Sequence, residues 1–406
     1  MDTRVADIGK QIIERLEKVH IGCFEGMEKP LLLISEQYPG VWLEHVYDSV
    51  FYAMQDPTKL YLAQNTIDLF LSYQREDGQF PCYVWDKKRT HGPNIGYAHI
   101  QECVSFAKLC LLLYRMDGDR ARLSRAYHAC AKWAAWLRAN RMTTGRGLVE
   151  MFVGYDTGHD NSGRLTGLSC PGKYEINGEA QDAAILPPAD PVAPVLAVDM
   201  SCNYYGTLRA LAEMAELLGE KEEGLRFASE AEAVKAALFA LCYDEKDAFF
   251  YDVDKDGRQR KCRSSTIFHL FLEGVLDREK DADVIEQIYR RHIANAEEFA
   301  TPYPYPSMAV NDPSCQGHPL FNCWGYYTQG LIALRTTLWL EQYGWKAEMD
   351  RLCRQWVAAW TEHFSLCKMG QELDPITGIP TASSEWYSST MLFYLYAAGR
   401  LGLLGK

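Results

Sequence analysis

Apolar side chains recur at helical spacing along most of the chain. The i, i+3, i+4 pattern is found in segments 4–20, 58–75, 97–116, 121–140, 200–218, 222–242, 280–293, 326–343, 346–365 and 387–402. Turn-forming pairs such as Asp56-Pro57 and Gly344-Trp345 separate these segments. The pattern therefore predicts an all-α protein.

Strand signals are short and local by comparison. The clearest is AFFYDVDKDGRQRK, 248–261, in which aromatic residues alternate ahead of a turn at Asp256-Gly257. This pattern predicts a short β-hairpin within a loop. Long strands do not alternate with the helices, which excludes a doubly wound parallel sheet.

Many of the predicted helices follow one another in pairs, which is typical of helical hairpins. Six such hairpins in a ring form an (α/α)6 toroid, whose inner helices are buried all round and whose loops enclose a cavity at one end. Two irregular stretches, 142–199 and 296–325, are long enough to be functional loops. No segment has a linker composition, so we expect a single domain over residues 1–406.

The charge balance limits the classes of partner. Lys and Arg total 42 and Asp and Glu total 54, which gives a net charge of −12, and no basic run is present. We therefore expect neither nucleic acid nor a membrane as a partner. The N-terminal segment is an amphipathic helix without an apolar signal core. The 13 cysteines are scattered without a CxxC pair, which is typical of free thiols in a reducing compartment, and we expect a cytoplasmic protein.

The histidines give no sign of a metal site. Ten are present, none in an HxxxH or HExxH pattern, so we expect neither a zinc site nor a cofactor.

A first candidate for chemistry is FVGYDTGHDNSGR, 152–164. Asp160 lies here in a short irregular loop, where Gly158 permits an unusual backbone turn and Arg164 can order a carboxylate. A carboxyl group held in this way at a cavity mouth suits a general acid. The alternative is an Asx-rich turn with no chemical role.

A second carboxyl group is needed to cleave a glycosidic bond. The loop KMGQELDPITGIPTASSEWYSS, 368–389, lies between the last two predicted helices and contains Glu372, Asp374 and Glu385. It is expected at the same end of the toroid as Asp160. Taken alone, it is also compatible with an ordinary Pro/Gly turn.

A third candidate segment is VWLEHVYDSVFYAM, 41–54. Glu44 and Asp48 are spaced i, i+4, which predicts that they share one helix face among aromatic residues. Acidic residues among apolar neighbours are either paired in a core or presented to a ligand.

Together these segments resemble the inverting α-glycosidases with (α/α)6 barrels: trehalases, glucosidase I-type enzymes and mannosylglycerate or glucosylglycerate hydrolases. The resemblance follows the chain in order. Its segments are 44–48 (EHVYD), SYQREDGQFP at 72–81, GHDNSGR at 158–164, the helix at 198–219, FATPYPYPSMAVNDP at 299–313 and FNCWGYYTQGLIAL at 321–334.

The resemblance implies roles for individual residues. GHDNSGR is similar to the G-x-D-N-S-x-R motif, which makes Asp160 the general acid. Glu372 is expected as the general base, with Glu385 as the alternative. The expected substrate-binding residues are Glu44, Tyr47, Asp48, Gln74, Asp77, Tyr155, Arg164, Trp324, Tyr326, Gln371 and Trp386.

Two departures from the family pattern alter this expectation. The base of the family's E-x-Y-x-P motif aligns with Gln371, and the glutamate comes one residue later. The segment that reads W-R-G-P in many members reads Trp324-Gly325-Tyr326-Tyr327 here, without the arginine.

The resulting hypothesis is an exo-acting inverting glycoside hydrolase for a small α-linked glycoside, a disaccharide or a glycosyl-organic acid. Its oligomeric state is left open. One alternative is a sugar epimerase or isomerase on the same barrel, which uses cavity histidines: His45, His99, His159 and His318. Another is a non-catalytic sugar-binding protein, motivated by Gln371.

Overall fold

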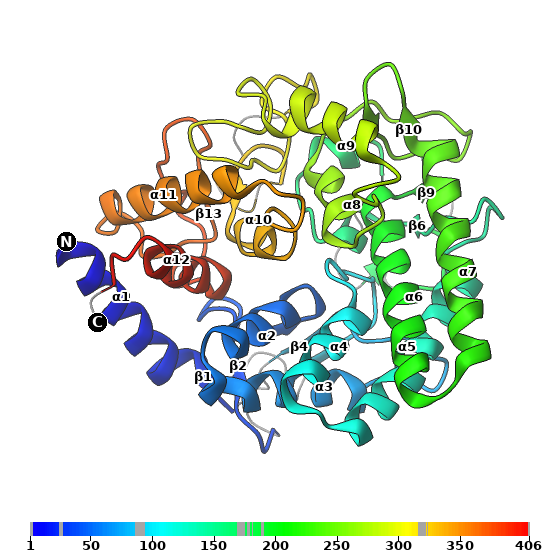
Figure 1. Ribbon diagram of the computed structural model, residues 1–406, viewed down its shortest axis with the longest axis horizontal. Helices are drawn as coiled ribbons and strands as arrows, with labels where there is room; N and C mark the ends of the chain where they lie inside the picture. The colour runs from blue at the N-terminus through cyan, green and yellow to red at the C-terminus, as the bar shows by residue number, and fades with distance from the viewer. Residues whose placement is uncertain are drawn as a thin grey trace.

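Helices in two concentric layers form the body of the protein (Figure 1). The computed structural model describes residues 3–23, 27–85, 94–168, 175–176, 179–180, 182–187, 191–315, 322 and 324–404. Within these residues the inner helices are α2 (Val46–Gln55), α4 (Phe106–Asp117), α6 (Val198–Leu218), α8 (Phe268–Leu272), α10 (Gly330–Arg335) and α12 (Ser388–Arg400). The outer helices are α1 (Thr3–Arg15), α3 (Leu60–Ser72), α5 (Arg120–Asn140), α7 (Lys221–Ala237), α9 (Ala282–Ile288) and α11 (Lys346–Glu362).

This arrangement confirms the predicted all-α (α/α)6 toroid. Helices that follow one another along the chain pack together as hairpins, for example α2 with α3 and α6 with α7, and α12 packs against α2 to close the ring. Glycines in the left-handed conformation end two of the inner helices, Gly118 after α4 and Gly219 after α6. Each therefore turns the chain back into the next helix.

The structure differs from the predicted helices in the late start of α4 and in an additional short helix, α8. The segment predicted to begin at residue 97 becomes helical only at Phe106, because Ser105 caps α4 by accepting a hydrogen bond from the Lys108 N–H. The residues before Ser105 are not helical. Gln101 among them has a positive φ of 54° and lines the pocket described below. Helix α8 was not predicted, because its five residues are too short for a periodic pattern.

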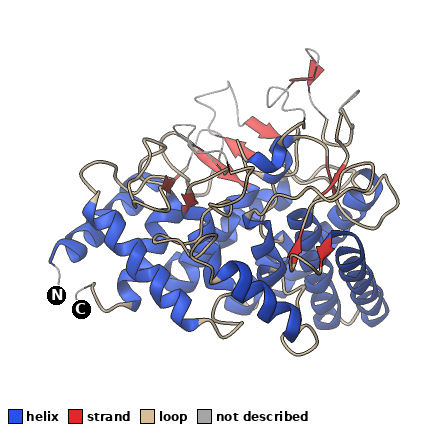
Figure 2. Ribbon diagram, turned by 90° about the horizontal axis from the view of Figure 1, so that it is seen from above, coloured by secondary structure: helices blue, strands red, loops and turns tan. Residues whose placement is uncertain are grey.

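Most short strands and long loops gather on one side of the helical ring (Figure 2). One antiparallel sheet has the order β3 (Gly40–Trp42), β4 (Tyr83–Trp85), β5 (Asn94–Gly96), with Val41 opposite Val84 and Val84 opposite Ile95. The two-stranded pairs are β1 (Ile21–Gly22) with β2 (Leu31–Leu32), β6 (Glu150–Met151) with β9 (Val195–Leu196), β7 (Glu175–Ile176) with β8 (Glu179–Ala180), β10 (Tyr243–Asp244) with β11 (Phe249–Phe250), and β12 (Thr328–Gln329) with β13 (Glu372–Leu373).

The predicted hairpin at 248–261 is present in outline. An antiparallel bridge joins Val253 to Gln259, and Gly257 between them has a φ of +85°. Strand β11, at the start of this segment, pairs antiparallel with the preceding strand β10. The segment therefore belongs to two consecutive hairpin turns.

A buried carboxyl group joins the first and last inner helices. Asp48 of α2 is 2% exposed, and its Oδ2 accepts hydrogen bonds from the hydroxyls of Ser388 (2.5 Å) and Ser389 (2.7 Å) of α12. Burial raises the pKa of Asp48 from 3.8 to about 6, against the opposing effect of these hydroxyls.

This pKa shift predicts a pH dependence of stability. Between about pH 4 and 6 the folded protein binds more protons at Asp48 than the unfolded chain, so stability falls as the pH rises through this range. In urea unfolding at about pH 5 and about pH 7.5, the wild type should lose about 1 kcal/mol more than Asp48→Asn between the two conditions. An identical pH dependence for both proteins would contradict the shift.

No helix within the described ranges is both long enough and apolar enough to cross a membrane.

Candidate functional site

A pocket is formed by the loops that flank the inner helices. Its empty volume is about 410 Å³, counting space open to solvent. Its walls are formed by Ile34, Tyr38, Trp42, Glu44, His45, Gln101, Gly158, Asp160, Asn322, Trp324, Gln371 and Tyr387. The wall thus contains four of the predicted site residues: Glu44, Asp160, Trp324 and Gln371.

The backbone around Asp160 is shaped to present its side chain. Gly158 and Asn161, on either side of it, both have positive φ, 70° and 61°. The carbonyl oxygen of Asp160 accepts a hydrogen bond from the Trp324 N–H at 3.0 Å. The loop that carries the carboxyl group is therefore tied to the loop that carries the pocket tryptophan, and Asp160 is left partly exposed.

Asn322 connects Asp160 to Gln371. Its Nδ2 donates to Asp160 Oδ2 at 2.9 Å, and its Oδ1 accepts from Gln371 Nε2 at 2.9 Å. With Asp160 Oδ2 as the acceptor of the first bond, Asn322 Oδ1 is left to accept from Gln371, and the orientation of both amides follows. The Nε2 atom of Gln371 is thus bonded to Asn322, whereas its Oε1 atom is buried without a hydrogen-bond partner.

Glu372 lies away from the pocket wall. Successive side chains of an extended segment point to opposite sides, so Gln371 faces the pocket and Glu372, at the start of β13, faces the interior. Glu372 is 0% exposed, and its carboxylate accepts hydrogen bonds from Gln329 Nε2 (2.6 Å) and Thr381 Oγ1 (3.0 Å). The expectation that Glu372 faces Asp160 across the pocket therefore differs from the structure.

Glu385 is also absent from the pocket wall. Its side chain is exposed, and its Oε1 accepts a hydrogen bond from the Lys368 N–H at 3.1 Å. Within the described residues, the loop 371–385 thus contributes an amide to the pocket and no carboxylate.

Glu44 is the second carboxyl group of the described pocket wall. It lies in a 3-10 turn, Leu43–His45, just before α2. Its Oε1 accepts from Gln101 Nε2 at 3.1 Å, and its Oε2 from the Cys103 thiol at 3.6 Å. Asp48, by contrast, points into the α2–α12 contact, so the two acids do not share the face predicted from their spacing.

His45 and Tyr387 form a neutral pair beside Glu44. His45 Nε2 and the Tyr387 hydroxyl are 2.6 Å apart. Burial, reinforced by Arg335, lowers the pKa of His45 well below its ordinary value, and burial raises the pKa of Tyr387 well above its own. Both groups are therefore uncharged at neutral pH, and the 3.5 Å contact of His45 Nδ1 with Glu44 is not a pairing of full charges.

Aromatic rings form the remaining walls. Tyr38 and Trp42 meet edge to face at 5.7 Å, and Trp324 stacks on His159 with ring centroids 4.5 Å apart and planes at 21°. An apolar, aromatic wall with a few polar groups is typical of small-molecule sites.

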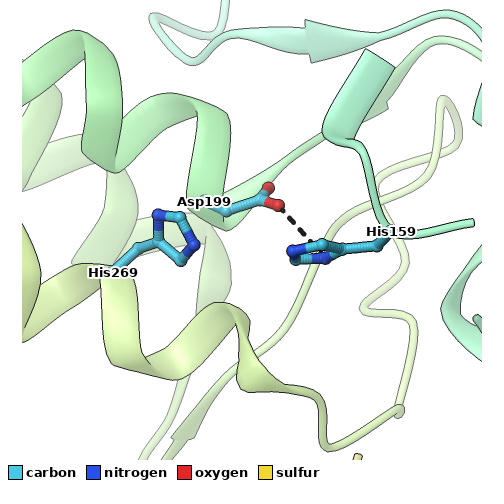
Figure 3. A group of neighbouring side chains, drawn as sticks. All are labelled: His159, Asp199 and His269. Carbon is cyan, nitrogen blue, oxygen red and sulfur yellow. Dashed lines mark ion pairs between the residues drawn. The ribbon is translucent and has the colours of Figure 1, made fainter. Parts of the chain in front are cut away.

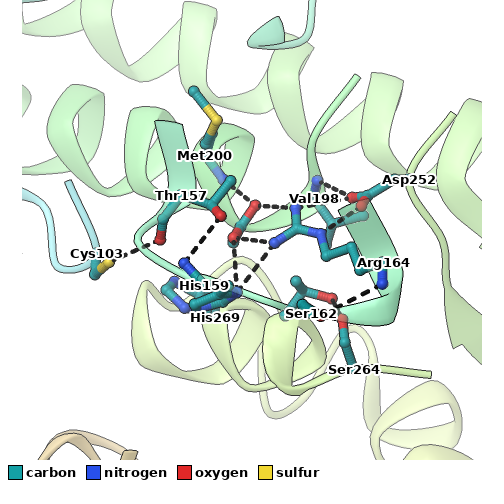
Figure 4. A network of polar contacts seen from close by, with 12 residues as sticks. Cys103, Thr157, His159, Ser162, Arg164, Val198, Met200, Asp252, Ser264 and His269 are labelled. Atoms are coloured by element: carbon teal, nitrogen blue, oxygen red, sulfur yellow. Dashed lines mark hydrogen bonds and ion pairs between the residues drawn. The ribbon is translucent and has the colours of Figure 1, made fainter. Parts of the chain in front are cut away.

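Arg164 lies beneath the pocket loop rather than in the pocket. Its guanidinium donates to Asp252 at 2.6 Å from Nε (Figure 4). It also donates to Asp199 at 2.6 Å from both Nη atoms. All three residues are at most 6% exposed. Burial alone would raise the pKa of Asp199, but the adjacent Arg164 holds it below its ordinary value. Arg164 thus anchors the Asp160 loop to α6, which differs from the predicted contact with substrate.

His159, Asp199 and His269 lie close enough to one another to hold a metal ion, with ligand atoms within 4.8 Å (Figure 3). Burial lowers the pKa of both histidines, so they are neutral. However, Arg164 donates to Asp199 from two nitrogens and to His159 Nδ1 at 3.1 Å. The Arg164 guanidinium thus occupies the position of a cation beside these residues, and we assign no metal to the cluster.

Three more predicted substrate-binding residues form hydrogen bonds within the protein and do not line the pocket. The Tyr47 hydroxyl bonds Thr337 Oγ1 at 2.7 Å. Gln74 Nε2 donates to the carbonyls of Gly78 (2.8 Å) and Ala129 (2.7 Å). Asp77 is an exposed turn residue that accepts from the Gln79 N–H.

The last three predicted residues, Tyr155, Tyr326 and Trp386, do not line the pocket. The Tyr155 ring lies 6.1 Å from that of His99, and Tyr326 lies 5.3 Å from Tyr327. Trp386 packs against Phe364 and beneath the Arg15 guanidinium on the outer side of the ring.

The histidines of the epimerase alternative are dispersed. His45 lines the pocket, whereas His99 Nε2 contacts Gln101 Oε1 at 2.7 Å and His159 packs behind Trp324. His318 lies outside the described residues.

Sequence reasoning missed several pocket residues. Gln101 and Asn322 both have positive φ, 54° and 49°. Gln101 lies inside the segment 97–116 that was predicted to be helical, and Asn322 lies in a stretch without a periodic pattern. Tyr38, Trp42 and Tyr387 are aromatic, but so are many core residues, and composition does not distinguish the two groups. Trp42 and Tyr387 lie within two of the three segments that the sequence singled out as candidates, and this was the available signal.

Several solved structures share this architecture. The GH63 mannosylglycerate hydrolase from Thermus thermophilus, in complex with glucose, aligns with a TM-score of 0.72 and 18% identity over 96% of this chain and 99% of that one. The neutral trehalase Nth1 from Saccharomyces cerevisiae aligns with a TM-score of 0.67 and 12% identity over 96% of this chain and 79% of the trehalase. At these identities the likeness shows a common fold.

Sequence comparison gives the family. An uncharacterized protein from Borreliella burgdorferi is 23% identical over 258 residues, which are 62% of this chain and 46% of that protein, so the match spans about half the length of this relative. Residues 47–387 match the mannosylglycerate hydrolase MGH1-like glycoside hydrolase domain. The matched range covers most of the chain and includes seven of the twelve residues that line the pocket, so the chain belongs to the MGH1-like glycoside hydrolase family.

Proposed function

We propose that this protein hydrolyses a small α-linked glycoside, releasing a terminal sugar with inversion of configuration, and that Asp160 is the general acid. The observation that carries the proposal is the placement of Asp160: a partly exposed carboxyl group on the wall of an aromatic pocket, oriented by a hydrogen bond from Asn322. A proton donor in this position can protonate the leaving oxygen of a glycoside.

The aromatic and polar lining of the pocket supports a sugar as the substrate. Trp42, Trp324 and Tyr387 offer ring faces or edges for a sugar, while Gln101 and Gln371 offer polar atoms for its hydroxyls. The Thermus enzyme of similar fold is a mannosylglycerate hydrolase, and it has been solved with glucose and with Tris and D-glycerate. A disaccharide or a glycosyl-organic acid fits this picture.

The test is a panel of α-linked disaccharides and glycosylglycerates, followed by proton NMR from the first minutes of reaction. Hydrolysis with inversion releases the β-anomer of the sugar first, before mutarotation. Release of the α-anomer would contradict inversion. An isomer formed without free sugar would indicate epimerisation, and binding without turnover would indicate a binding protein; either result would reject the proposal.

Gly158 gives a further prediction for this site. A Cβ at this position would lie 2.5 Å from Glu44 Oε2, and the φ of +70° disfavours any L side chain. We expect Gly158→Ala to displace the Glu44 carboxylate and to lower kcat/KM at least tenfold, roughly 1.4 kcal/mol in transition-state stabilisation.

The matched control is Gly118→Ala. Gly118 has a similar φ, +66°, but a Cβ added there would have no atom within 4 Å. Both variants should therefore lose about 1 kcal/mol of stability for the left-handed backbone, whereas activity should fall in Gly158→Ala alone. Equal activity in the two variants would show that Glu44 tolerates displacement.

A further inference from the structure

The pocket wall contains the proposed general acid, Asp160, but the loop 371–385 contributes an amide side chain, Gln371. Gln371 is 4% exposed, it lines the pocket, and its Oε1 has no hydrogen-bond partner. An amide oxygen accepts a hydrogen bond from water. It is far too weak a base to remove a proton from that water, so Gln371 can orient a nucleophile but cannot activate it.

Gln371 is linked to the proposed acid through Asn322. Asn322 Nδ2 donates to Asp160 Oδ2, and Asn322 Oδ1 accepts from Gln371 Nε2, each at 2.9 Å. The Oε1 atom of Gln371 can therefore hold a water molecule in the same pocket as Asp160. That water has no base on the loop 371–385.

Glu44 can supply that base. It is the other carboxyl group in the described part of the pocket wall, and it is 7% exposed. Its Oε1 accepts a hydrogen bond from Gln101 Nε2, and its Oε2 accepts one from the Cys103 thiol. Glu44 Oε2 lies against Gly158 of the Asp160 loop, where the absence of a side chain leaves room for it.

We propose that Glu44 is the general base of the reaction and that Gln371 orients the attacking water. This inference rests on the proposed hydrolysis. The water oxygen forms a bond to the anomeric carbon as the bond from that carbon to the leaving oxygen breaks. One proton of the water passes to Glu44, and the proton of Asp160 passes to the leaving oxygen. Solvent then returns both carboxyl groups to their starting states.

The test uses Glu44→Gln with α-D-glucosyl and α-D-mannosyl fluoride as probes. Fluoride departs without a general acid, so turnover of these probes depends on activation of the water. Loss of a general base typically costs 10²–10⁴-fold, and we expect this decrease in Glu44→Gln. Azide, which attacks without losing a proton, should restore turnover and give the glycosyl azide of inverted configuration.

A second variant keeps the test decisive if the first is poorly folded. In Glu44→Gln/Gln371→Glu, a carboxylate replaces the amide that holds the water, and hydrolysis should return without azide. Glu385→Gln is the matched control, because Glu385 is exposed and lies off the pocket wall, and it should behave as the wild type does.

Three results would overturn the assignment: full turnover of the fluorides by Glu44→Gln, no rescue by azide, or equal acceleration of the wild type by azide. The last would mean that the native pocket has no base. A wild type that hydrolyses neither the fluorides nor any glycoside of the panel would instead reject the proposed function, and the inference with it.

Discussion

Replacement of Asp160 by asparagine is expected to reduce hydrolysis of an unactivated α-glycoside by 10²–10⁴-fold. The amide retains the shape of the side chain and can still accept the hydrogen bond from Asn322 Nδ2, so the variant should fold normally. What it loses is the proton for the leaving oxygen. Initial rates on the glycoside identified by the NMR panel measure this loss.

The α-glycosyl fluorides separate a chemical role from a structural one. Because fluoride needs little protonation to leave, Asp160→Asn should retain most of its activity on them. Asp77→Asn is the control, since Asp77 is an exposed turn residue outside the pocket wall and the chemical change is the same. Equal losses on both classes of substrate would show that Asp160 acts in binding or loop structure instead.

Replacement of Arg164 by methionine should give the largest loss of stability. The guanidinium forms three hydrogen bonds of 2.6 Å to Asp199 and Asp252, and all three side chains are buried. Methionine would leave two carboxylates without a counter-charge in the protein interior. Removal of one partner from a buried ion pair typically costs 3–5 kcal/mol, and urea unfolding at neutral pH should show a decrease of about this size.

Arg115→Met tests whether burial is the cause. Arg115 donates two hydrogen bonds to Glu213, at 2.7 and 2.9 Å, but both side chains are about half exposed. An exposed pair of this kind contributes about 0–1 kcal/mol. If the two methionine variants were equally stable, the Arg164 network would be no more important than a surface ion pair.

The helical ring was predictable because its signal is local and repeated. Inner helices such as α6 bury most of their side chains, whereas outer helices such as α11 bury one face. Both patterns are visible in the sequence. The segment of the candidate general acid, Gly158–Ser162, was also visible locally, because glycine and small polar residues favour a turn there. Its similarity to the family motif then suggested the role of Asp160. The order of the family segments then connected the two.

The partners of each side chain were decided by the tertiary structure. Glu44 and Asp48 are four residues apart, yet one reaches the pocket and the other packs against α12, because the helix begins between them. Gln371 and Glu372 are neighbours, and the direction of β13 turns the amide toward the pocket and the glutamate into the interior. Periodicity along a chain specifies which residues can be buried, but only the packing of distant segments determines which atoms meet: Asn322 joins Asp160 to Gln371 across loops far apart in sequence.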